Sequence, residues 1–155
     1  MSAAENSRTV DGRAVASRLQ PILVDLIALG LNGKQAHWHV RGRHFTPLHE
    51  QLDTLVADAR TYADDVAERL VALGVAVDGR AQTVAESTTT FPEGFLADDK
   101  VIALIVDELE AVIEHARETL DDLEDLDLIS QDLVIELVKV LEKHRWMFEA
   151  QKDSA

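Results

Sequence analysis

The stretch PLHEQLDTLVADARTYADDVAERLVALG, residues 47–74, has the apolar spacing of one long helix with a single buried face. Thr46 is a favourable N-cap residue, and Pro47 suits the first helical position. Gly74 is a plausible stop signal. The sequence therefore predicts a helix from about Pro47 to Leu73.

This predicted helix carries potential metal ligands at helical spacing. His49 and Asp53 are four residues apart, as are Asp64 and Glu68. Asp53 and Asp64 are separated by 11 residues, which at about 3.6 residues per turn returns to nearly the same angle. All four side chains are therefore expected along one stripe of the helix.

The four side chains cannot meet within one chain, because His49 and Glu68 are roughly 28 Å apart along a straight helix. Either the stripe holds two unrelated pairs, or a second copy supplies the missing half. Two antiparallel copies crossing near Asp58 and Ala59 would place each histidine end beside the carboxylate end of the other. Small residues on or beside the stripe would allow this approach, namely Ala57, Ala63 and Ala67.

His37 ends the preceding predicted helix and is brought near His49 by a short link, so it can add a second nitrogen. Two histidines with Asp53, Asp64 and Glu68 form an oxygen-rich, sulfur-free set that suits Fe(II), with Mn(II) or Zn(II) as substitutes. The other interpretation is solvated carboxylate pairs, which are common on acidic helices. The combined spacing favours the metal.

Three further helical stretches complete an all-α prediction. One runs to about Val40, one opens at Asp98 and Asp99, and one runs from Ser130 to about Ala150. Residues 74–97 form a long connection in which AQTVAES can form a short helix. The arrangement predicts a four-helix bundle with its long connection between helices two and three, an architecture used for carboxylate-bridged iron sites.

Composition limits the possible classes. The 155 residues contain no cysteine, which excludes disulfides and thiolate metal sites. No signal-peptide pattern and no apolar run of membrane-spanning length is recognised, so a cytoplasmic protein with no membrane partner is expected. The net charge of −14 attracts cations and repels phosphate backbones.

The sequence resembles the Dps family, the DNA-binding proteins from starved cells, also called miniferritins. The resemblance covers residues 14–150, with 1–13 as a flexible N-terminal tail and 151–155 as a short C-terminal tail. It rests on KQAHW, LHEQLD, YADDVAERLVALG, DLDLISQDLV and EKHRWMFEA at residues 34–38, 48–53, 62–74, 125–134 and 142–150.

This resemblance implies a ferritin-like bundle in a hollow shell of twelve subunits. It implies intersubunit ferroxidase sites that oxidise Fe(II), usually with hydrogen peroxide, and a stored Fe(III) mineral that limits oxidative damage. His37 and His49 from one chain would bind iron with Asp64 and Glu68 from another, and Asp53 would bridge or support a second iron.

The resemblance also suggests roles outside the ligand set. Trp38 is an interface aromatic or an electron donor near the iron. Asp127 and Asp132 would line iron-entry pores, although acidic residues at a helix start also have a capping role. The remaining histidines are expected to be structural or exposed, namely His39, His44, His115 and His144.

Two rival functions stay open. One is a nucleoid-compacting, nucleoid-associated DNA-binding protein with a secondary metal site, and the other is a purely structural helical oligomer. Neither end of the chain is a basic arm: Arg8, Arg13 and Arg18 are balanced by Glu5 and Asp11 within residues 1–18. Weak or absent DNA binding is therefore expected.

Overall fold

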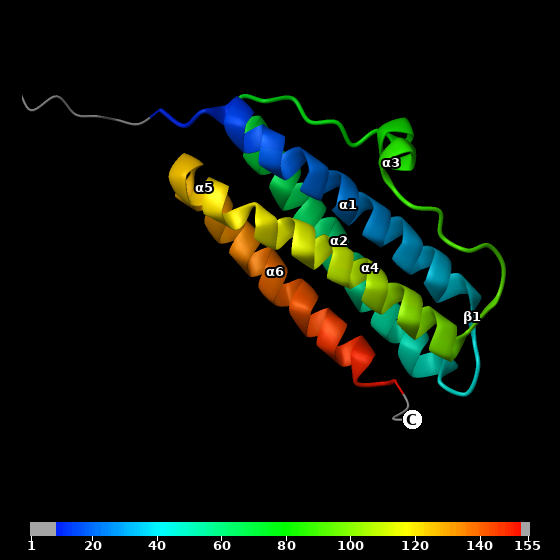
Figure 1. Ribbon diagram of the computed structural model, residues 1–155. Coiled ribbons are helices and arrows are strands. Elements are labelled where there is room, and N and C mark those ends of the chain that lie inside the picture. Colours follow the sequence, from blue (N-terminus) through cyan, green and yellow to red (C-terminus); the bar gives the residue numbers. More distant parts are fainter. Residues whose placement is uncertain (1–8, 153–155) are drawn as a thin grey trace, which may run out of the picture.

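The structure is a computed structural model that describes residues 9–152 (Figure 1). Four long helices form a bundle: α1 (Gly12–His39), α2 (Phe45–Ala72), α4 (Asp98–Glu118) and α6 (Leu128–Glu149). The short α3 (Ala81–Ser87) lies in the long connection and coincides with AQTVAES. The predicted four-helix bundle with an extra helix between its second and third members is confirmed.

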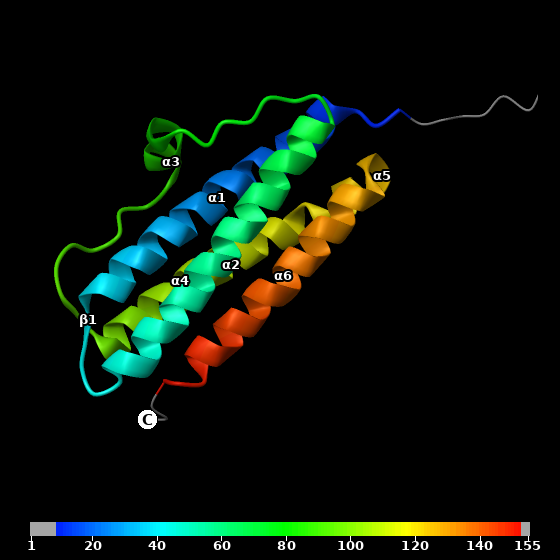
Figure 2. The same cartoon turned by 180° about the vertical axis from the view of Figure 1, so that it is seen from behind.

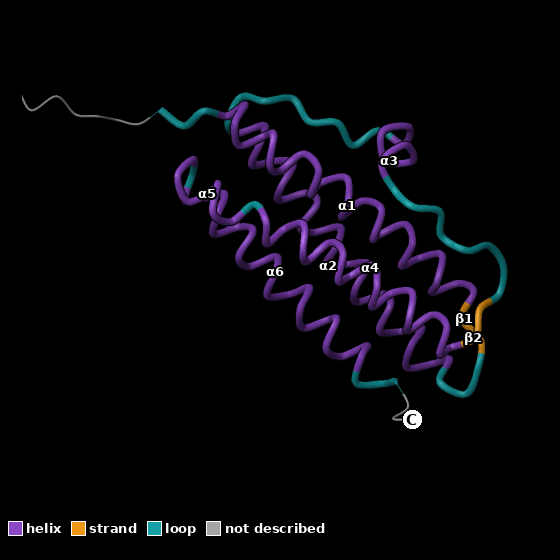
Figure 3. The backbone as a smooth tube through the Cα atoms, viewed as in Figure 1, coloured by secondary structure: helices purple, strands orange, loops and turns teal. Residues whose placement is uncertain are grey.

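The long connection crosses the full length of the bundle. It leaves the end of α2, passes over α1 with α3 packed on that helix, and reaches the start of α4 at the opposite end (Figures 1 and 2). There, two strands that were not predicted form a short parallel pair, β1 (Val40–Arg41) and β2 (Leu96–Ala97) (Figure 3). This pair fixes the α1–α2 link against the start of α4.

Branched aliphatic side chains from all four long helices fill one continuous core. Gly33 lets α1 and α2 approach closely, because a Cβ atom there would lie 2.8 Å from a methyl carbon of Val56. This close approach, one helical turn before His37, sets the end of α1 against the first turns of α2.

The start of α1 lies well before Pro21, which the helix includes. Asp11 is the N-cap, and its side chain accepts hydrogen bonds from the backbone N–H groups of Arg13 and Ala14. The helix thus begins at Gly12, before the expected domain boundary at residue 14. Residues 1–8 and 153–155 of the two expected tails lie outside the described residues.

The expectation that no apolar run reaches membrane-spanning length is wrong for α1. This helix is long and apolar enough over one 18-residue window, half of which is buried inside the bundle. Its buried residues include Leu19, Ile22, Leu26 and Leu29, which belong to the core. A helix buried in a protein core can have the same length and apolar composition as a membrane-spanning helix, and α1 packs as a core helix here.

The end of α2 was predicted better than its start. Gly74 has a φ of 80°, and the N–H groups of Gly74 and Val75 donate to the carbonyls of Val71 and Leu70, which is a Schellman motif. The N-cap, however, is His44 rather than Thr46, because the helix continues back to Phe45. Pro47 is tolerated there because the first-turn N–H groups lack intrahelical acceptors.

The junction before α6 also differs from the prediction. The separate helix α5 (Leu120–Leu126) follows α4, and α6 starts at Leu128 rather than Ser130. Asp127 is its N-cap, with a side chain that accepts from the N–H of Ser130. The acidic stretch around residue 124 is thus mostly helical, with its break confined to Asp127.

Candidate metal centre

His37 near the end of α1 and His49 near the start of α2 hold each other through the backbone. The Nδ1 of His37 donates to the carbonyl of His49 at 2.7 Å, and the Nδ1 of His49 donates to the carbonyl of His37 at 2.8 Å. The two rings are stacked, with centroids 3.5 Å apart. This reciprocal pairing fixes the position of both imidazoles.

The pairing also fixes the tautomer of each ring. A carbonyl oxygen only accepts, so each Nδ1 carries a hydrogen, and each Nε2 of a neutral ring keeps its lone pair. Histidines that bind metals commonly donate their other ring N–H to a carbonyl in this way. The two rings are therefore prepared to bind a cation through Nε2.

Asp53 lies beside the histidine pair, one helical turn after His49. Its carboxylate is 3.5 Å from the Nδ1 of His37 and forms an ion pair with the ammonium group of Lys34. The Lys34 hydrogen bond, aided by the nearby charges, holds the pKa of Asp53 below its usual value. A metal ion that used this oxygen would have to displace Lys34.

Asp64 and Glu68 lie further along α2 and are exposed. Among residues 9–152, no group of three or more histidine, aspartate and glutamate side chains is arranged to hold a metal ion. A single chain thus presents His37, His49 and Asp53 at one end of α2 and Asp64 with Glu68 at the other. The structure does not bring the two groups together within the chain.

The midpoint of α2 corrects one detail of the expected pairing. Ala59 is fully buried and packs inside its own bundle, so it cannot contact a second copy, whereas Ala63 is 9% exposed and lines a pocket together with Asp64. Ala57 and Arg60 are exposed. An antiparallel pairing that sets Asp53 opposite Asp64 also sets Ala57 opposite Arg60, so a small side chain would face the long one.

Two aromatic residues adjoin the histidines. Trp38 is 62% exposed, which leaves both suggested roles open. Phe45 was not singled out in the sequence, yet its ring lies 5.0 Å from that of His49. Its position four residues before His49 places both on one helical face, and this spacing is the signal that could have identified it.

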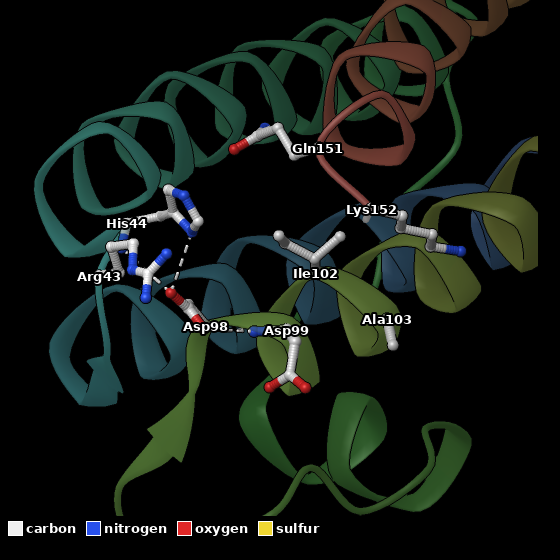
Figure 4. A pocket seen from close by; sticks show the side chains of 8 residues that line it. All are labelled: Arg43, His44, Asp98, Asp99, Ile102, Ala103, Gln151 and Lys152. Carbon is white, nitrogen blue, oxygen red and sulfur yellow. Dashed lines mark hydrogen bonds and ion pairs between the residues drawn. The ribbon is translucent and has the colours of Figure 1, made fainter. Parts of the chain in front are cut away.

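His39 and His44 lie outside this centre. His39 bonds to the carbonyl of Gln35 through Nδ1. His44 lines a pocket at the end of the bundle, where its backbone N–H and its Nδ1 both contact one oxygen of Asp98 (Figure 4). These bonds lower the pKa of Asp98. The role of His44 seen here is to tie the α1–α2 link to α4.

The two suggested pore residues have different surroundings. Asp127 is 7% exposed and pairs with the guanidinium of Arg69 at 2.7 Å. Burial alone would raise its pKa, but hydrogen bonds from Ser130 and Arg69 outweigh burial and lower the pKa. Its carboxylate is thus already engaged in capping and ion pairing, as the capping interpretation predicts. Asp132 is exposed and remains the better pore candidate.

The histidines of the later helices have carboxylate partners that sequence spacing did not indicate. His115 Nδ1 lies 2.6 Å from a carboxylate oxygen of Asp25, and His144 Nε2 lies 2.6 Å from one of Asp58. His144 is buried, and its Nδ1 has no partner within residues 9–152. Both pairs join different helices, so no local pattern reveals them.

Comparison with known proteins agrees with the four-helix fold. A family model described as a ferritin-like domain matches residues 16–154, almost the whole bundle. The Dps structure from Microbacterium arborescens in the high iron form superposes with a TM-score of 0.87 and 43% identity, covering 90% of this chain and 92% of that one. The chain is therefore a ferritin-like protein.

Two curated relatives narrow the class. A DNA protection during starvation protein from Mycolicibacterium smegmatis is 38% identical over 91% of this chain and 78% of its own length. DNA protection during starvation protein 2 from Deinococcus radiodurans is 36% identical over 92% of this chain, which spans only 60% of that longer protein. The chain belongs to the Dps, or miniferritin, family.

Proposed function

We propose that this protein oxidises Fe(II) at sites shared between two copies, preferentially with hydrogen peroxide, and stores the Fe(III) product as a mineral inside a shell of twelve chains. The observation that carries the proposal is the locked pair His37 and His49, whose Nδ1 atoms both donate to backbone carbonyls, with the carboxylate of Asp53 3.5 Å from the Nδ1 of His37. The carboxylates of Asp64 and Glu68 are exposed on the same helix, beyond reach of that pair.

In this proposal His37 and His49 of one chain bind an Fe(II) substrate ion together with Asp64 and Glu68 of a second chain. Asp53 bridges to, or supports, a second and more weakly bound iron. The donor set of imidazole and carboxylate suits Fe(II), and Zn(II) or Mn(II) can substitute. The M. arborescens relative was solved in a high iron form, which supports iron as the ion.

The reaction balances with two iron ions at each site. Each Fe(II) loses one electron, and hydrogen peroxide takes both electrons as its O–O bond breaks. With two water molecules the products are two FeO(OH) units and four protons. Supplying both electrons at one site avoids release of a one-electron oxygen radical, so the contribution of the protein is to place two ions together. Trp38, next to His37, would pack at the interface between copies or supply an electron near the iron.

Entry of iron is assigned to a pore that includes Asp132. A ring of carboxylates around a symmetry axis attracts cations. The chain has the corresponding overall charge of −14. We also propose a cytoplasmic location, on which the iron chemistry does not depend.

The deciding experiment is complementation between two inactive variants. One carries His37→Ala and His49→Ala, and the other carries Asp64→Ala and Glu68→Ala. A mixed pair would contain one complete site, with histidines from the second variant and carboxylates from the first. Random pairing makes half of the pairs mixed, so about one quarter of all sites should be complete.

The readout is peroxide-dependent Fe(II) oxidation followed by stopped-flow absorbance. Co-assembled variants should recover about a quarter of the wild-type amplitude, while each variant alone stays near the background rate. Asp65→Ala, which removes a neighbouring exposed carboxylate on α2, is the matched control and should retain full activity. Absence of recovery in shells shown to contain both variants would contradict a shared site.

DNA compaction is the second candidate, suggested by the names of the relatives. The net charge of −14 opposes it, because binding to DNA requires cations that neutralise phosphates. A gel-shift titration at physiological salt should show weak or no binding. Tight binding that weakens steeply with added salt would favour this second function.

A further inference from the structure

A polar pocket lies between α1 and α4, in a different part of the bundle from the metal ligands. Its volume is about 250 Å³. Both helices contribute polar side chains, and residues 87–89 at the end of α3 contribute hydroxyl groups. Its lining includes Asp25, Ala28, Asn32, Glu108, Val112 and His115.

Two hydrogen-bonded pairs cross the α1–α4 boundary at this pocket. Asp25 pairs with His115 at 2.6 Å, and Asn32 donates to Glu108 at 2.8 Å. Seven residues separate the two pairs on each helix, which corresponds to roughly 10 Å along the helix axis. The pocket thus has a carboxylate near each end.

The floor between the pairs is apolar, and the walls supply no competing ammonium or guanidinium group. Ala28 and Val112 lie between the two pairs, and no lysine or arginine lines the pocket. Each pair uses one carboxylate oxygen, Oδ2 of Asp25 and Oε1 of Glu108. Each carboxylate keeps a second oxygen outside these hydrogen bonds, Oδ1 of Asp25 and Oε2 of Glu108. Both oxygens can therefore accept from a bound cation.

We propose that this pocket binds a linear aliphatic diammonium ion, with one ammonium group on Asp25, the other on Glu108, and the methylene chain over Ala28 and Val112. Three or four methylene groups fit the spacing. Bonds of about 1.5 Å separate the two nitrogens by roughly 5 to 6 Å. Charge-assisted hydrogen bonds of about 2.8 Å at both ends bring the total to roughly 10 to 12 Å.

A single metal ion fits the pocket less well. The two carboxylates are two helical turns apart, whereas metal–ligand bonds are only about 2 Å long. No three-ligand cluster occurs among residues 9–152. Two separated cationic groups joined by an apolar chain match both the charge spacing and the floor.

The ionisation of Glu108 supports the same ligand. Burial raises the pKa of Glu108 to about 7, with a smaller contribution in the same direction from the negative charge of Asp25. The hydrogen bond from Asn32 acts in the opposite direction and lowers it. Asp25 and His115 are the other titratable groups that line the pocket, and residues 87–89 contribute only hydroxyls. An ammonium ion beside Glu108 favours its charged form, so binding near pH 7 should release a fraction of a proton.

The test is calorimetric titration of the assembled protein with 1,4-diaminobutane at pH 7. A series of diamines from two to six carbons should show an affinity maximum at three or four carbons. Butylamine, which can fill only one end, should bind about tenfold or more weakly, as expected when one charge-assisted hydrogen bond is lost. Buffers with different ionisation enthalpies should reveal the proton release.

Variants separate this site from general cation binding on an acidic surface. Glu108→Gln keeps the hydrogen bond from Asn32 but loses the charge, and it should weaken binding about tenfold or more, as should Asp25→Asn. Glu114→Gln changes an exposed carboxylate on the same helix and should leave the affinity unchanged. A flat length series, or equal affinity for Glu108→Gln and the wild type, would overturn the proposal.

Discussion

Glu108 gives the sharpest prediction about stability, because its ionisation is linked to burial in the α1–α4 boundary. The substitution Glu108→Gln keeps the size of the side chain and an oxygen that can accept from Asn32. It removes only the ability to ionise. The variant should therefore match the wild type at low pH and exceed its stability at high pH.

The magnitude follows from the pKa of Glu108, which burial raises from 4.5 to about 7. The difference of about 2.5, at about 1.36 kcal/mol per pH unit, gives an upper value of about 3 kcal/mol per chain for the cost of ionisation. Because the folded-state pKa is the higher one, the favourable contribution of the neutral carboxyl is complete below pH 4.5. This contribution is lost as the pH rises through about 7.

The assay compares thermal unfolding of both proteins from pH 5 to pH 8.5 at one protein concentration. At roughly 2–4 °C per kcal/mol for a chain of this size, the Tm difference should grow to about 6–12 °C at the alkaline end. Glu114→Gln, on the exposed side of α4, controls for the lost surface charge. Parallel curves for Glu108→Gln and the wild type would show that Glu108 ionises normally and that the reasoning is wrong.

Three further outcomes test other parts of the structure. Lys34→Gln removes the ammonium group paired with Asp53, so the second metal ion should bind more tightly. Calorimetry with Co(II) as a redox-stable probe measures this affinity. An unchanged isotherm would mean that Lys34 does not compete with the metal for Asp53. Asp127→Ala leaves the half-buried Arg69 without its carboxylate partner and removes the α6 cap, so the free energy of unfolding in urea should fall by roughly 2 to 3 kcal/mol. Since the folded-state pKa of Asp127 is lowered, this contribution should be lost in the wild type as the pH falls below the usual carboxylate range. Asp132→Asn should slow peroxide-dependent iron uptake several-fold without changing the unfolding free energy, whereas equal uptake rates would remove Asp132 from the entry path.

Much of the fold follows from local sequence signals. The repeat of apolar residues identified the long helices, and the composition of residues 74–97 identified the crossover with its short helix. The errors lie at helix ends that depend on distant partners. His44 is the N-cap of α2 in place of Thr46, and its link is tied to Asp98, 54 residues away. Such contacts leave no periodic pattern in the sequence.

The candidate site also has features that the sequence predicts and features that depend on contacts between helices. The spacing of Asp53 and Asp64 along one helix indicated a split site, and the structure keeps those ends apart within one chain. The reciprocal hydrogen bonds of His37 and His49 depend on the close approach of α1 to α2, which sequence spacing does not specify. Lys34 could have been identified, because it precedes His37 by three residues and so shares its helical face.

The division of α2 into a core face and a ligand face has a thermodynamic consequence for assembly. The buried face is fixed by the bundle, so Asp53, Asp64 and Glu68 are held outward whether or not a second copy is present. If two copies meet there, their carboxylates approach one another and repel, unless a cation or a group such as Lys34 lies between them. A metal ion that binds only the completed site raises the equilibrium constant for pairing of two copies. Pairing raises the equilibrium constant for metal binding by the same factor. Chelation should therefore weaken the contact between copies of α2 while leaving each bundle folded, because the core is made of apolar side chains and His37, the buried ligand, keeps its hydrogen bond to the carbonyl of His49 without metal.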